Sequence, residues 1–267
     1  MNKKLLFWII ALIITLGGVY YQRVTGPTYP LSGSAYLNQD EIKYRIERSH
    51  SSSSDYIISI KAEDSSILGE LRWKRFKTND EWTYEKMEFK NGKLNATLPK
   101  QPPAGKLQYQ IKLRNKTNQI SIPAESPLVI RFKGDVPPVI LIPHIFIMFL
   151  VMLLSTRTGL EYFNEKPELK KFTFWTLGLL FIGGMILGPL TQLYAFGELW
   201  TGIPFGIDLT DNKTLIAFIG WIAAAIAIYK SKNPKRWILA AAVLLLIIYS
   251  IPHSVLGSEL DYSKLNH

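Results

Sequence analysis

The chain has 267 residues, a formal net charge of +10 and no cysteine. The lack of cysteine excludes a disulfide framework, thiolate metal sites, iron–sulfur clusters and covalently attached c-type haem. Residues 22–135 are polar, whereas residues 137–256 are almost entirely apolar, a division typical of a polytopic membrane protein with one soluble domain. The basic residues flank the apolar segments, where such charges orient membrane helices, so they do not indicate a nucleic-acid partner.

Residues 1–21 are the first predicted element, a transmembrane anchor. An apolar run at 5–21 follows Lys3 and Lys4, and it is about as long as a helix that crosses a bilayer. A secretory signal has a similar composition, but no small-x-small cleavage site follows this run. We therefore expect a helix that stays attached to the chain.

Residues 22–135 are predicted to form an external β-sandwich. Apolar and polar residues alternate in a series of short runs, which is the period of a half-buried strand. Asn91-Gly92 lies between two such runs, and this pair is the strongest short signal for a hairpin turn. Roughly six or seven strands in about 100 residues favour a sandwich of immunoglobulin or fibronectin type III style. We see no nucleophile–base pair or metal quartet here, so we expect a binding or docking module.

Residues 136–256 are predicted to add four membrane helices, at about 138–154, 172–196, 215–229 and 237–252. The loop 197–214 is acidic, whereas the N-terminus and the loops 156–171 and 230–236 are basic and should therefore lie inside. The flanking basic residues are Lys3, Lys4, Arg157, Lys166, Lys170, Lys171, Lys230, Lys232, Lys235 and Arg236.

The predicted fold class is thus a five-helix transmembrane bundle, N-inside and C-outside, with the β-sandwich inserted between the first and second helices. In a bacterium this arrangement places the chain in the inner membrane. The sandwich, the loop 197–214 and the external tail 257–267 would then lie in the periplasm.

Two Ile-Pro-His triplets, ending in His144 and His253, mark the outer ends of predicted helices. Ionisable residues at membrane depth are costly to bury and are therefore candidates for function. His144 lies about six residues, or roughly 9 Å, inside its helix, so the two imidazoles are expected at similar depth. Paired imidazoles hold the iron of b-type haem, and two imidazoles with a carboxylate can hold another metal. The alternative is that both histidines are hydrogen-bonded residues of the membrane interface. The carboxylates that could complete such a metal site are Glu198, Asp208, Asp211, Glu259 and Asp261.

The loop before the fourth helix supplies three further candidate cofactor contacts, Trp200, Asp208 and Asp211. An aromatic side chain offers a flat apolar area for a porphyrin face. Each residue has a structural alternative: Trp200 in the aromatic belt of the bilayer surface, and one of the aspartates as the N-cap of the following helix.

Residues 194–217, which contain Gly206-Ile207-Asp208 and Asn212-Lys213-Thr214 before an apolar helix, resemble the haem-handling loop of the cytochrome c assembly family. That family also places its loop between two helix-end histidines, the positions of His144 and His253 here. The present loop has one tryptophan where the family has several, and Ile207 stands where a tryptophan precedes the aspartate. The resemblance implies haem at the outer face of the membrane and a role in haem handling.

Two functions are therefore predicted. The first is a protein that binds haem b, or a metal, for electron transfer or haem handling. The second is a non-catalytic scaffold or docking subunit of a cell-envelope complex. Both place the chain in a lipid bilayer beside a membrane-protein or periplasmic partner. A metal-dependent hydrolase is disfavoured because His-Glu-x-x-His and Gly-x-Ser-x-Gly are absent from the sequence, and whether the chain is an enzyme stays open.

Overall fold

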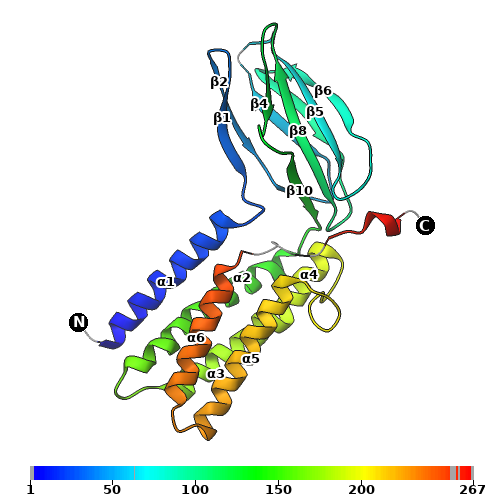
Figure 1. The fold of residues 1–267 in the computed structure, drawn as a ribbon. Coiled ribbons are helices and arrows are strands. Elements are labelled where there is room, and N and C mark those ends of the chain that lie inside the picture. The colour runs from blue at the N-terminus through cyan, green and yellow to red at the C-terminus, as the bar shows by residue number, and fades with distance from the viewer. Residues whose placement is uncertain (1–2, 63, 253–256, 258, 266–267) are drawn as a thin grey trace. The chain divides into compact units, whose positions relative to one another are not determined.

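A computed structural model describes residues 3–62, 64–252, 257 and 259–265 (Figure 1). The chain forms two compact units, which we describe separately. The helical unit comprises Met1–Pro27 and Val136–Ser258, and the strand unit comprises Thr28–Asp135 and Glu259–His267. The C-terminal residues that the sequence suggested as a separate external tail thus belong to the strand unit.

The helical unit is built from long apolar segments. Its elements are α1 (Lys3–Thr25), α2 (Pro138–Leu160), η1 (Glu161–Phe163), α3 (Leu169–Leu180), η2 (Phe181–Leu187), α4 (Gly188–Phe196), α5 (Leu209–Lys230) and α6 (Pro234–Ser250). α3, η2 and α4 follow one another directly, and η2 is a wider π-helical stretch of seven residues.

Four helices of the described residues are long and apolar enough to cross a membrane: Lys3–Thr25, Pro138–Phe163, Leu169–Phe196 and Leu209–Lys230. The fifth predicted span corresponds to α6, which has 17 residues. A helix of that length extends over about 25 Å, less than the roughly 30 Å of a bilayer core. The structure therefore supports membrane association through four helices, with α6 packed among them.

Trp221 of α5 lies at the centre of the helical core and is fully buried. The buried residues around it include Val151, Met152, Leu180 and Leu245. α2 packs against both α3 and α6. A Cβ at Gly159 of α2 would lie only 2.6 Å from the Cβ of Ala242 in α6, so glycine allows these two helices to approach closely.

The strand unit contains one large sheet and one hairpin. Its elements are β1 (Leu31–Leu37), β2 (Asp40–Ile46), β3 (Ser49–Ser51), β4 (Tyr56–Lys61), β5 (Leu68–Arg75), β6 (Thr83–Lys90), β7 (Lys93–Leu98), β8 (Lys106–Arg114), β9 (Gln119–Ile122), β10 (Leu128–Lys133) and η3 (Tyr262–Leu265). β1 and β2 form the hairpin. The large sheet has eight strands in the order β3-β10-β8-β5-β6-β7-β4, with β9 paired to β8.

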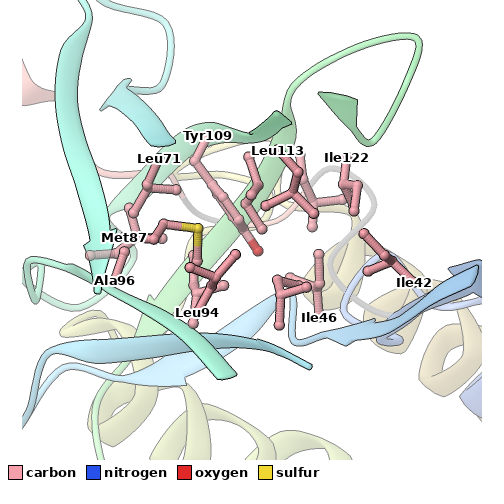
Figure 2. Packing of buried hydrophobic residues seen from close by; sticks show 14 of the residues in the cluster. Ile42, Ile46, Leu71, Met87, Leu94, Ala96, Tyr109, Leu113 and Ile122 are labelled. Atoms are coloured by element: carbon pink, nitrogen blue, oxygen red, sulfur yellow. The ribbon is translucent and has the colours of Figure 1, made fainter. Parts of the chain in front are cut away.

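The sheet curls because β6 pairs with two different neighbours along its length. Residues 83–87 of β6 pair with β5, and residues 88–90 pair with β7. The alternating side chains of the curled sheet enclose the core, and Figure 2 shows Ile42 and Ile46 of β2 facing that interior. The predicted hairpin turn is confirmed: Asn91 and Gly92 join β6 to β7 with φ of 52° and 72°, the positive angles that a tight hairpin favours.

The predicted fold class is wrong. Instead of two facing sheets of immunoglobulin type, the strands form a single eight-stranded sheet that approaches a barrel, and β3 joins its edge parallel to β10. The molecule is a mixed α and β architecture, in which an N-terminal helix is followed by strands and then by the remaining helices. Alternation indicated which residues point inward, but it carries no information about which strands pair.

Candidate functional site

His144 connects α2 to the π-helical stretch of the following helix. Its Nδ1 donates to the carbonyl oxygen of Gly183 at 3.0 Å. The N–H of Gly188 also points to this carbonyl, which therefore accepts from two donors. The side chain of His144 is partly buried. His253, its predicted partner, lies outside the described residues, so the pairing of the two imidazoles stays a prediction.

The two predicted aspartates anchor the loop between α4 and α5. Asp208 caps α5 by accepting from the N–H of Thr210 at 2.7 Å. The sequence had suggested an N-cap role for one of these two aspartates. Asp211 is buried, and its Oδ2 accepts from the backbone N–H groups of Thr201 and Gly202 at 2.6 and 3.0 Å. Gln192 of α4 donates to the same oxygen at 3.0 Å. These bonds hold the loop against both helices.

The side chain of Trp200 bonds within the same loop: its indole N–H donates to the carbonyl of Ile203 at 3.1 Å. The loop turns its apolar residues outward: Phe205 is 83% exposed and Ile207 is 90% exposed. Within the described part of the chain, no group of three or more His, Cys, Asp or Glu is placed to hold a metal ion. Trp200 thus lies in the loop to which Asp211 of α5 bonds, while His144 bonds to η2.

Sequence analysis missed a buried ion pair in the helical unit. Arg157 and Glu161 are each only 1% exposed, and the Arg157 guanidinium donates to the Glu161 carboxylate. The carboxylate also accepts from Asn164 and from the backbone N–H of Glu168, both at 2.9 Å. The guanidinium carbon lies 4.9 Å from the centre of the Phe172 ring. The i, i+4 spacing was the available signal, but Arg157 was taken for a surface charge.

The strand unit contains a cleft of about 500 Å³ beside the C-terminal segment 259–265. Three cations line it: Arg75 at the end of β5, Lys77 in the following turn, and Lys106 at the start of β8. Lys77 and Ala104, which also lines the cleft, have φ of 58° and 66°. Non-glycine residues adopt this region at some cost in free energy, and such positions gather at functional sites.

Glu259 lines the cleft beside its lysines. Its two carboxylate oxygens accept from the ammonium groups of Lys77 and Lys106, each at 2.6 Å. Burial acts to raise the pKa of Glu259, but the hydrogen bonds and charges of the two lysines outweigh it and hold that pKa below its ordinary value. The Lys106 side chain is 14% exposed, and burial lowers its pKa despite the neighbouring carboxylate.

Tyr262 also lines the cleft and is 7% exposed. Its hydroxyl accepts from the backbone N–H of Lys106 at 2.9 Å. The same hydroxyl lies 3.0 Å from the Lys106 carbonyl and 3.1 Å from Oε1 of Gln101, and it donates to one of them. Burial raises the pKa of Tyr262 to about 12, so the hydroxyl keeps its proton and both roles at neutral pH.

Arg75 packs against the ring of Tyr262. Its guanidinium carbon lies 5.1 Å from the ring centre, within range of a cation–π contact. Asp80 holds the guanidinium in place with two hydrogen bonds of 2.6 and 3.0 Å. The Arg75 hydrogen bond also lowers the pKa of Asp80. Sequence analysis gave no sign of this cleft, because its parts lie far apart in the chain.

Comparison with models of known protein families and with curated protein sequences finds no match to this chain. Its function must therefore be argued from the geometry of its own sites.

Proposed function

We propose that this chain is an integral membrane protein whose strand unit docks another protein on the outer side of the membrane. The basic helix ends gather at one end of the helical unit. Lys4 of α1 lies 2.7 Å from Glu168 beside α3, and Lys235 of α6 donates to the carbonyl of Asn164 at 2.6 Å. Basic ends remain on the cytoplasmic side.

The chain passes from α1 to the strand unit after Thr25 and enters α2 at Pro138. Both are the helix ends opposite the basic ones. This connectivity supports an external strand unit, which in a bacterial inner membrane means the periplasm.

The cleft beside 259–265 is the observation that carries the docking function. Its basic residues hold the short C-terminal segment, which ends in the 3-10 helix η3, through charged, aromatic and backbone contacts at once. Peptide-recognition sites combine backbone hydrogen bonds, which supply affinity, with side-chain pockets, which supply specificity. A surface that already binds peptide in this way is suited to a protein partner.

Site-specific photo-crosslinking in cells tests this function. A photoreactive residue at Asn79, exposed on the rim of the cleft, should capture one discrete partner protein. The same residue at Asn118, in the turn at the other end of β8, should not capture it. Lys77→Glu should abolish the Asn79 product, whereas Lys116→Glu, an exposed charge reversal in the turn that contains Asn118, should not. Equal amounts of crosslinked product at Asn79 and Asn118 would contradict docking at the cleft. An Asn79 product that Lys77→Glu leaves unchanged would also contradict it.

The haem function is retained as a second proposal because of one observation at His144. A ligating histidine usually donates its other ring nitrogen to a carbonyl or carboxylate, which fixes the tautomer. The Nδ1 bond of His144 to Gly183 has this form and directs Nε2 to the ligand role. Absorption spectra of the purified protein, oxidised and reduced, test this. A Soret band lost in His144→Ala/His253→Ala supports haem, and a featureless spectrum from cells rich in haem rejects it.

A further inference from the structure

Residues 259–263 form one wall of the cleft and contact its other residues as a short bound peptide would. Glu259 contributes the charged contact, Leu260 donates its backbone N–H to the carbonyl of Ala104 at 3.2 Å, and Tyr262 is inserted beside Lys106. The two side-chain anchors are therefore the first and fourth residues of the sequence Glu-Leu-Asp-Tyr.

One of the two residues between the anchors, Asp261, makes no such contact with the two lysines of the cleft. Asp261 is exposed, and its carboxylate accepts from the N–H and hydroxyl of Ser263 and approaches Lys264. These are bonds within the segment itself. Recognition by the cleft therefore depends on the glutamate and the tyrosine, with the backbone of Leu260 setting the register.

The contacts that hold the segment are of a kind that a competitor can replace. The Lys77 side chain is 66% accessible and the Lys106 side chain 14% accessible. The exposed contact with Lys77 contributes little net stability, so most of the ionic contribution comes from Lys106. The segment gains its occupancy by being tethered, since tethering raises the effective concentration into the millimolar range. A partner segment with the same anchors competes for the same groups.

We infer that Lys77, Lys106 and Arg75 of the cleft recognise partner segments of the pattern Glu-x-x-Tyr, and that residues 259–262 of the chain cover these groups as an internal substitute that the partner displaces. This inference rests on the docking function proposed above and specifies the ligand of that site. Lys77 and Lys106 bind the glutamate, while the backbone of Lys106, with Arg75 against the ring, binds the tyrosine.

The probe is a fluorescent peptide with the sequence of residues 257–265, Gly-Ser-Glu-Leu-Asp-Tyr-Ser-Lys-Leu. Its binding is measured on the full-length protein in lipid nanodiscs. The variant Glu259→Gln/Tyr262→Ala frees the cleft and should bind the peptide about tenfold more tightly than the wild type, because a tethered competitor has been removed. Asp261→Asn, which changes the charge of the same segment outside the cleft contacts, should bind like the wild type.

A second experiment measures the specificity of the cleft for the peptide sequence. On the freed variant, peptides with glutamine for the glutamate or phenylalanine for the tyrosine should bind several-fold more weakly, and Lys77→Glu should abolish binding. Should the double variant fail to fold, a fluorophore on Lys264→Cys in an otherwise wild-type chain gives the answer. A saturating amount of unlabelled peptide should then lower its anisotropy as the segment is released.

Equal affinity of the wild type and the freed variant, or an anisotropy that saturating peptide leaves unchanged, would overturn the inference. The two proposals fail in different ways. If the peptide does not bind while the Asn79 crosslink remains sensitive to Lys77→Glu, the ligand class is wrong and the docking function stands. If the crosslink is absent while the peptide binds, the cleft is an internal latch and the docking function is wrong.

Discussion

The carboxylate of Glu259 lies 2.6 Å from the ammonium group of Lys106, although 153 positions separate the two residues in the chain. This pair, with Tyr262, ties the C-terminal segment to the sheet where β8 begins. The cleft thereby contains residues from β5, from the turn before β6, from β8 and from the end of the chain. It exists only in the folded strand unit.

Tyr262→Phe should destabilise the docked segment without disturbing the sheet. The substitution removes the hydroxyl that bonds to the backbone of Lys106, and a net loss of about 0.5–1.5 kcal/mol is expected for such a hydrogen bond. Amide hydrogen exchange measures this as faster exchange at Lys106. Tyr84→Phe is the control, because Tyr84 is 55% exposed on β6. Unchanged exchange at Lys106 would show that the hydroxyl does not hold the segment.

Acid should release the docked segment. Because the pKa of Glu259 is lowered by its two lysines against the opposing effect of burial, its contribution to docking is complete above the ordinary glutamate pKa of about 4.3 and is lost as the pH falls through the lowered value. Arg75, Asp80, Asp261 and Tyr262 are the other ionisable groups that line this cleft.

Anisotropy of a fluorophore on Lys264→Cys measures this release, since the natural chain contains no cysteine. We expect a constant value through neutral pH and a drop below about pH 4. Glu259→Gln should remove the acid transition. A transition centred near neutral pH would mean that another group controls the docking.

Arg157→Met should destabilise the helical unit strongly. The substitution leaves the buried Glu161 carboxylate without its cation, and breaking a buried pair in this way costs about 3–5 kcal/mol. Arg157→Met/Glu161→Gln should recover much of that loss, because no unpaired charge remains. Unfolding by SDS titration in mixed micelles gives the free energies, with Lys232→Met as an exposed control. Equal losses in the single and double variants would show that the unpaired Glu161 carboxylate is not the cause of the loss.

Single introduced cysteines should report opposite sides of the membrane. Asn79→Cys in the strand unit and Lys232→Cys between α5 and α6 are both exposed positions. In intact spheroplasts a membrane-impermeant maleimide should label the first and not the second, and both should react after permeabilisation. Labelling of Lys232→Cys in intact cells would reverse the proposed orientation.

Local periodicity in the sequence was enough to locate most elements. The apolar runs correspond to α1, α2, α3 to α4, α5 and α6, and the alternating runs correspond to the strands. Asn91-Gly92 identified its hairpin, because the backbone angles of that turn depend on the two residues alone. The sequence also predicted that one of the two aspartates caps α5, and that residue is Asp208.

Features that depend on distant residues were not predictable from these patterns. The pairing of β6 with both β5 and β7, which turns a sandwich into a single curled sheet, involves non-local choices between equally alternating strands. Arg157 appeared to be a flanking surface charge, because its burial depends on Phe7, Trp8 and Phe172 from other helices. The cleft was missed because Glu259 and Tyr262 lie more than 150 positions from Lys106 in the chain.

The measurement that tests the central claim most directly is the Asn79 photo-crosslink in cells, compared between the wild type, Glu259→Gln and Lys77→Glu. If the cleft docks a partner and the chain's own segment competes for it, Glu259→Gln weakens the competitor and should increase the crosslinked product several-fold. Lys77→Glu removes a partner contact and should abolish the product. A decrease in both variants would contradict the account, because it would make the bound segment a requirement for docking instead of its competitor.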